Sequence, residues 1–110
     1  MEPDAVVIVL VTWPGGSDPA PFAAALVEAG VAACVNVLPE MESIYRWEGR
    51  IERARERQIL VKTTAGCLEP LRQQIAGRHP YQVPEMLVVE TAAGGEGYLR
   101  WVRESTGQPG

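Results

Sequence analysis

The sequence contains a single histidine, two cysteines and no long hydrophobic run. Cys34 and Cys67 are too few for the disulfide framework of a small secreted domain, so we expect both to be free thiols in a reducing compartment. The longest apolar stretch, residues 5–11, is shorter than the roughly 20 residues that a membrane-spanning helix needs. It follows the acidic segment 1–4, whereas an export signal begins with basic residues. These features predict a cytoplasmic protein without membrane contact.

Positive charge is also scarce, because 10 lysines and arginines stand against 14 acidic residues, for a net charge of -4. Proteins that bind nucleic acids normally present a clustered basic surface. The glycine pairs Gly15-Gly16 and Gly94-Gly95 lack the spacing and the following Lys or Ser/Thr of a phosphate-binding loop. The sequence therefore predicts no nucleic-acid partner and favours cations as ligands.

The rest of the composition, with 46% hydrophobic and 22% charged residues, is that of an ordinary folded protein. A chain of 110 residues can bury one modest core, so we expect a single domain over residues 1–110. Apolar and turn patterns predict strands over residues 5–11, 32–47, 50–64 and 86–89. Helices are predicted between Ser17 or Asp18 and Gly30, over residues 66–76 with Gly77 as the stop, and at the end as far as Gly107.

Periodicity and turn residues add detail to these elements. Stretch 5–11 does not alternate, which is typical of a strand covered on both faces. Pro39-Glu40 predicts a bend or bulge. Glu48-Gly49 predicts a two-residue hairpin turn, which would place Trp47 opposite Arg50 and Glu42 opposite Arg55. The apolar stripes of the three helices are Phe22, Leu26 and Ala29, then Leu68, Leu71 and Ile75, and finally Tyr98, Trp101 and Val102.

Helices after the first and third strands, with a hairpin between the second and third, predict an α+β, ferredoxin-like (split β-α-β) fold: an antiparallel sheet with two helices on one face, an extended central hairpin and a C-terminal helix. The hairpin is too long for a four-stranded sheet of this size. We expect its end to overhang and to expose Tyr45, Trp47 and Ile51. Because such surface is usually covered by another subunit, the pattern predicts self-association.

The strongest candidate metal ligands are Cys34 and His79. A thiolate and an imidazole are good ligands for transition metals, but one chain supplies too few of them for a closed site. We therefore expect any such site to be assembled between subunits. The alternatives are that Cys34 is a small core residue and that His79 makes hydrogen bonds in its loop. Cys67, at a helix start, fits a partly buried first-turn residue.

Other polar and aromatic residues are candidates for binding. Glu56 and Lys62 are separated by an even number of residues, so they share one face of a strand and can pair or share a ligand. Lys62 also follows an apolar run, where its charge needs a partner. Tyr45 and Trp47 share a face and form either a subunit contact or a stacking platform. No residues form an evident nucleophile, base and orienting group, so we expect no enzyme activity. The alternative is an enzyme that uses Lys62, Glu56 and His79 as acid or base groups.

Taken in order, several segments resemble the divalent-cation tolerance (CutA) family. Those that carry the resemblance are residues 26–28 and 32–36 (AACVN), the hairpin 43–49 (SIYRWEG), residues 56–64, the loop 79–85 (HPYQVPE) and residues 98–101. The resemblance implies a ferredoxin-like subunit in a homotrimer like that of PII-type signalling proteins, with clefts between the subunits. The family positions that line those clefts correspond to Cys34, Tyr45, Trp47, Glu56, Lys62, His79 and Tyr81.

Copper and other divalent metals are the ligands that the resemblance implies. One histidine rather than a pair precedes Pro80, which implies a metal that is not tightly bound. The first functional hypothesis is therefore a trimeric divalent-cation tolerance protein that binds metal at Cys34 and His79, with Glu56 and Lys62 shaping the cleft. The second is a PII-like signalling or scaffold trimer that binds a small anionic metabolite or a partner protein through Lys62 and the hairpin.

Overall fold

The chain forms four strands and three α-helices in a computed structural model that describes residues 1–107. In chain order they are β1 (Val6–Pro14), α1 (Ala20–Glu28), β2 (Cys34–Trp47), β3 (Arg50–Thr64), the short 3-10 turn η1 (Ala65–Cys67), α2 (Leu68–Arg78), β4 (Leu87–Glu90) and α3 (Glu96–Glu104). Among these residues, no helix is both long enough and apolar enough to cross a bilayer.

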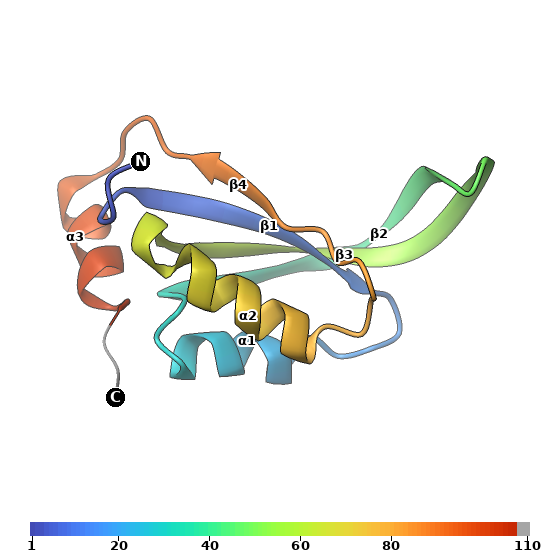
Figure 1. Cartoon of the computed structure of the whole chain (residues 1–110), viewed down its shortest axis with the longest axis horizontal. Helices are drawn as coiled ribbons and strands as arrows, with labels where there is room; N and C mark the ends of the chain where they lie inside the picture. Colours follow the sequence, from blue (N-terminus) through green and yellow to red (C-terminus); the bar gives the residue numbers. More distant parts are fainter. Residues whose placement is uncertain (108–110) are drawn as a thin grey trace.

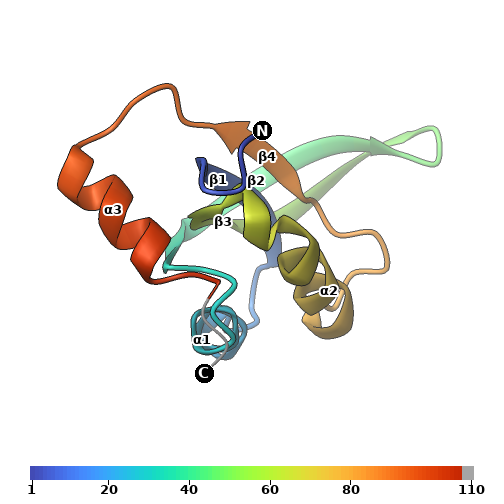
Figure 2. The same ribbon diagram turned by 60° about the vertical axis from the view of Figure 1, so that its left-hand side comes forward.

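The strands form one antiparallel sheet in the order β2-β3-β1-β4. Helices α1 and α2 lie on one face of it, and the β2-β3 hairpin projects beyond them as an arm (Figure 1). α3 lies at the end of the sheet away from the arm, to the side of α1 and α2 (Figure 2). This arrangement confirms the ferredoxin-like α+β fold, the long central hairpin and the terminal helix.

The core lies between the sheet and the two helices on its covered face. Odd-numbered residues of β1 and their partners on β3 point into it, and Val9 and Val61 are both fully buried. They meet Leu26 of α1 and Leu71 of α2 in one apolar cluster. Of the even-numbered residues of β1, Val6 is buried against Val102 of α3, whereas the later ones, from Ile8 to Pro14, are only half buried. The expectation that both faces of this strand are covered is therefore not met within one subunit.

Several predicted boundaries differ from the structure. β1 continues to Pro14, because the next amide, that of Gly15, still donates to Arg55 O at 2.7 Å. A Cβ on Gly15 would lie 2.7 Å from the same oxygen, so this close approach requires glycine. Gly77 does not stop α2, which continues to Arg78 and ends where the His79 amide donates to Ile75 O. Gly30 does end its helix, at φ 74°.

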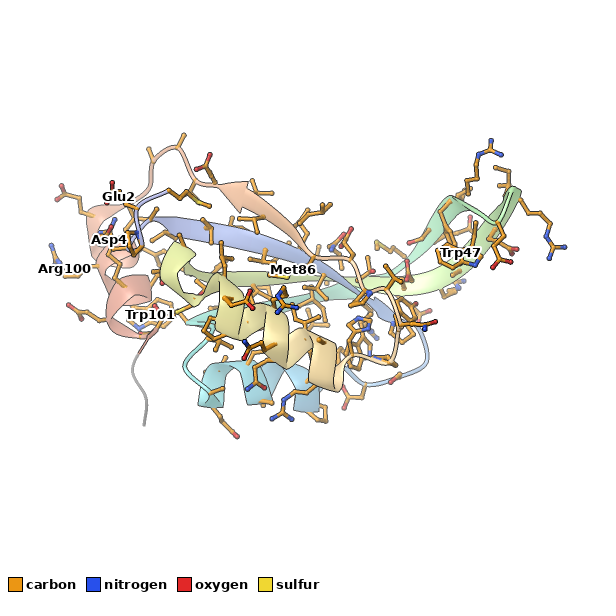
Figure 3. The ribbon with its side chains drawn as sticks, viewed as in Figure 1. Glu2, Asp4, Trp47, Met86, Arg100 and Trp101 are labelled. Carbon is orange, nitrogen blue, oxygen red and sulfur yellow. The ribbon has the colours of Figure 1, made fainter. Side chains whose placement is uncertain are left out.

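The predicted apolar stripes are partly wrong. Ala29 is exposed, and Leu68 is only partly buried before the fully buried Leu71. In α3 only Val102 is fully buried, against Val6 and Ala33. Tyr98 and Trp101 of that helix are 47% and 43% exposed. Trp101 of α3 therefore faces outward in the subunit, at the end of the sheet (Figure 3).

The hairpin turn has the predicted geometry. Glu48 and Gly49 take φ values of 49° and 78°, which suit a two-residue turn whose twist matches that of the strands. Trp47 pairs with Arg50 and Glu42 with Arg55, as expected. The charges nevertheless pair diagonally, because the Glu42 carboxylate lies 3.7 Å from Arg53. The pair is exposed and is worth less than about 1 kcal/mol.

Candidate functional site

A bulge in β2 determines which side chains reach the candidate site. Val37 pairs with Ile59 and Glu40 with Arg57, so two residues of β2, at 38 and 39, stand opposite the single residue 58. One extra residue turns every later side chain to the other face of the strand. Before the bulge, even-numbered residues of β2 share a face with the even-numbered residues of β3. After it, odd-numbered ones do, which brings Tyr45 and Trp47 to the face of Glu56.

The loop after α2 completes this region. The backbone amide of Tyr81 donates to Nδ1 of His79 at 3.0 Å, so that ring nitrogen is an acceptor. Nε2 therefore carries the proton and donates to Thr12 O, at 2.6 Å. The His79 ring is buried and packs edge-on against Trp13 and Phe22. The histidine thus holds the loop against the end of β1.

Tyr81 connects the loop to β3. Its hydroxyl donates to Oε2 of Glu56 at 2.7 Å, and the whole Glu56 residue is 8% exposed. Burial and the neighbouring Glu56 carboxylate raise the pKa of the Tyr81 hydroxyl above its ordinary value. Tyr81 therefore remains a hydrogen-bond donor at neutral pH. One carboxylate oxygen of Glu56 has its partner in this bond.

A cleft of about 620 Å³ lies between the arm and the loop. This volume is typical of a small-molecule site. The cleft contains two carboxylates, those of Glu56 and Glu85, and no lysine, arginine or histidine. Gln58 donates to Glu85 at 3.0 Å and orients it. The lining residues are Thr12, Tyr45, Trp47, Glu56, Pro80, Tyr81, Gln82, Val83, Pro84 and Glu85.

Cys34 and Lys62 form a second group, away from this cleft. They are direct partners in the β2-β3 pairing, on the sheet face opposite α1 and α2. The Lys62 ammonium lies 5.7 Å from the centre of the Tyr98 ring, within cation–π range. Glu56 shares the predicted face of β3 with Lys62, but the six-residue separation puts them about 20 Å apart along the strand. They do not pair.

The structure does not bring Cys34 and His79 together within a subunit. Cys34 pairs with Lys62 near the start of β1, whereas His79 contacts Thr12 near its end. Both ring nitrogens of His79 are used in hydrogen bonds, so a metal would have to displace one of them. Over residues 1–107, no three His, Cys, Asp or Glu side chains are grouped to hold a metal ion. The residues of one subunit therefore do not fit a metal site.

Two residues of the cleft, Thr12 and Glu85, were not singled out from the sequence as site residues, and neither was Gln58, which orients Glu85. Thr12 is the first polar residue after the apolar run of β1, and Gln58 is a polar residue within β3. Glu85 follows Pro84 at the end of the loop. The signal that could have identified them is a polar residue next to an apolar strand. The path of the loop 79–85 determines which of these residues come into contact, and no local sequence pattern predicts that path.

The comparisons with known proteins agree with this fold. A family profile described as "CutA1 divalent ion tolerance protein" matches residues 7–105. The chain belongs to the CutA1 family. The CutA divalent-cation tolerance protein of Thermus thermophilus is 43% identical over 100 residues, which cover 91% of this chain and 97% of that protein. The human protein CutA is 36% identical over 94% of this chain and 58% of its own length.

Solved CutA1 structures have the same fold. The Thermus thermophilus structure gives a TM-score of 0.89 at 42% identity and covers 93% of this chain and 99% of its own. The structure of CutA1 from the psychrotrophic bacterium Shewanella sp. SIB1 gives 0.89 at 30% identity, covering 94% of this chain and 97% of its own. These names describe tolerance of divalent ions and do not name a reaction.

Proposed function

We propose that this CutA1 protein acts as a cytoplasmic homotrimer in the tolerance of divalent metal ions, binding copper or another divalent ion weakly between subunits, without catalysing a reaction. Family membership is the observation that carries the proposal. The proposed metal ligand is the half-buried thiol of Cys34. It lies on the sheet face opposite α1 and α2. His79 joins it only if the ion replaces one of its two hydrogen bonds.

The uncovered sheet face supports placing the function between subunits. Ile8 of β1 is half buried, and Leu87 and Val89 of β4 are 55% and 45% exposed. On the same face, the arm adds the exposed residues Tyr45 and Trp47. Contiguous apolar surface of this kind marks protein contacts. Repeating the same face around a symmetry axis would also bring together ligands that one chain lacks.

Calorimetric titration with copper and zinc tests the metal proposal. We expect saturable binding that Cys34→Ser weakens at least tenfold, because a thiolate is a far better ligand for these metals than a hydroxyl. Cys67→Ser is the matched control, since the Cys67 thiol is buried and its sulfur lies 3.5 Å from Thr64 Oγ1. Absence of saturable binding, or equal binding by the Cys34 variant, would contradict the metal role.

A second candidate function has one observation in its favour. Lys62 is half buried, and no carboxylate of residues 1–107 lies within ion-pairing distance of it. A half-buried cation that has an aromatic ring but no carboxylate beside it favours an anionic ligand, as in a PII-like trimer that binds a small metabolite. Native mass spectrometry is expected to show a retained small molecule that Lys62→Met abolishes. The same spectrum from both proteins would rule this candidate out.

A further inference from the structure

The two faces of the arm differ in charge. Ile59 and Val61 of β3 point into the core, and the alternation of the strand carries Arg57, Arg55 and Arg53 onto the same side of the sheet. Because directly paired residues share a face, the β2 residues opposite these arginines lie there too. This surface, the outer face of the arm, consists of Glu40, Glu42, Ile44 and Arg46 of β2 and Ile51, Arg53, Arg55 and Arg57 of β3. It carries four arginines and two glutamates in a chain whose net charge is -4.

The outer face lies on the opposite side of the sheet from Tyr45, Trp47 and Glu56. The arm projects beyond α1 and α2, so neither helix covers it (Figure 1). The side chains of Arg53 and Arg55 are 70% and 73% exposed. The contact proposed between subunits uses the other side of the sheet. The outer face therefore remains accessible in the proposed trimer.

The arginines of the outer face are only partly balanced by carboxylates. Two of them, Arg53 and Arg55, lie 3.7 and 3.8 Å from the two glutamates of the face. Within residues 1–107, Arg46 and Arg57 take part in no ion pair. Arg53, Arg55 and Arg57 follow one another about 7 Å apart along one strand, where like charges repel. An anionic partner would offset this repulsion.

A pocket of about 450 Å³ lies at the base of the outer face. Arg57 lines it together with Val37 and with residues 16–20, which lead into α1. Nη1 of Arg57 donates to Leu38 O at 3.3 Å, which holds the guanidinium in place before any ligand binds. Val37 and Pro19 supply apolar surface. The pocket can therefore hold an apolar side chain beside a fixed positive charge.

Spacing and charge indicate the class of partner. Side chains on one side of an extended peptide are also about 7 Å apart, so alternate carboxylates match the arginines of β3. Asp18 and Glu40 line the pocket, so an apolar side chain fits there better than another carboxylate. A nucleic acid or an anionic membrane would bring a large negative surface against a subunit of net charge -4. A short acidic segment contacts the arm alone.

We propose that the outer face of the arm binds an extended acidic segment of a partner protein. Alternate carboxylates of the segment pair with Arg53, Arg55 and Arg57, and an apolar side chain at one end enters the pocket. Neither Cys34 nor Lys62 takes part. The interaction therefore goes beyond metal tolerance and does not depend on it.

Three fluorescent peptides of equal length test the proposal on the full-length protein by fluorescence anisotropy. Each begins with leucine, followed by threonine alternating with glutamate, glutamine or lysine. We expect only the glutamate peptide to bind saturably, and added salt to weaken its binding, because salt screens exposed charges. A glutamate peptide that begins with glycine is expected to bind about tenfold more weakly, because it has no leucine side chain to bury.

Matched variants separate the outer face from the rest of the surface. Arg53→Gln combined with Arg55→Gln is expected to weaken binding about tenfold, because each exposed charge contact contributes up to about fivefold. Arg72→Gln combined with Arg78→Gln removes the same charge from the exposed surface of α2 and is expected to leave binding unchanged. Glu42→Gln removes the carboxylate that competes for Arg53 and is expected to strengthen binding about twofold or more.

The same measurements can overturn the proposal. Equal binding of the glutamate and glutamine peptides, binding of neither, or unchanged affinity of the double variant of the arm would show that these arginines form only a solvated surface. Tighter binding of an oligothymidylate of equal charge would make the partner a nucleic acid. A lower mass of the assembly in the arm variant would place the outer face between subunits. Cys34→Ser is expected to bind the glutamate peptide normally, so failure of the metal proposal would leave this one intact.

Discussion

Val89→Glu is expected to convert the proposed trimer into monomers of 12.0 kDa. Val89 pairs with Ile8, and directly paired residues of an antiparallel sheet point to the same face. That face is opposite the core, because the neighbours Val7 and Val9 are fully buried under the helices. A glutamate there costs the subunit little. In an interface, an unpaired carboxylate costs several kcal/mol in each subunit.

Val27→Glu provides a matched control for this result. Val27 lies on α1 and is 44% exposed, against 45% for Val89, so both substitutions add the same charge at equally exposed sites. Only the β4 variant is expected to change the mass measured by sedimentation or light scattering. A trimer of unchanged mass and stability in Val89→Glu would show that the uncovered sheet face is not the contact between subunits.

Local patterns predicted most of the fold because each depends on a few neighbouring residues. Glu48-Gly49 determined the turn, and the turn determined the register of the hairpin as far as the bulge between Val37 and Glu40. The bulge at Pro39 was predicted because proline cannot donate to the strand ladder. Errors arose where tertiary contacts decide. Gly77 is a helix stop by preference, but the Ile75 carbonyl and His79 amide extend the helix past it.

The site was harder to predict than the fold. Strand periodicity placed Glu56 and Lys62 on one face, but their six-residue separation puts them about 20 Å apart along β3. Glu56 therefore meets Tyr81, whereas Lys62 pairs with Cys34. Glu56 accepts its hydrogen bond from Tyr81, which belongs to the loop that follows α2. The turn of Tyr45 and Trp47 toward Glu56 depends on the single extra residue of the bulge. A periodic pattern read through that bulge without correction would place these rings on the wrong face.

His79→Ala is expected to destabilise the protein by about 3 kcal/mol or more. The substitution leaves Thr12 O and the Tyr81 amide, which are both partly buried, without their partners, at about 1 kcal/mol for each. It also removes a ring that lies 5.0 Å from Trp13 and 6.0 Å from Phe22, centre to centre. The loop then loses its attachment to β1, and Tyr81 its position beside Glu56.

Urea unfolding in the presence of a chelator distinguishes this structural role of His79 from metal ligation. All samples need the same protein concentration, because the stability of an oligomer depends on it. Gln82→Ala changes an exposed residue of the same loop and is expected to have little effect. If His79→Ala loses stability only when metal is supplied, the hydrogen bonds to Thr12 and Tyr81 contribute little and His79 acts as a ligand. Loss of the same size with and without metal is the expected result, because both bonds are made by the protein alone.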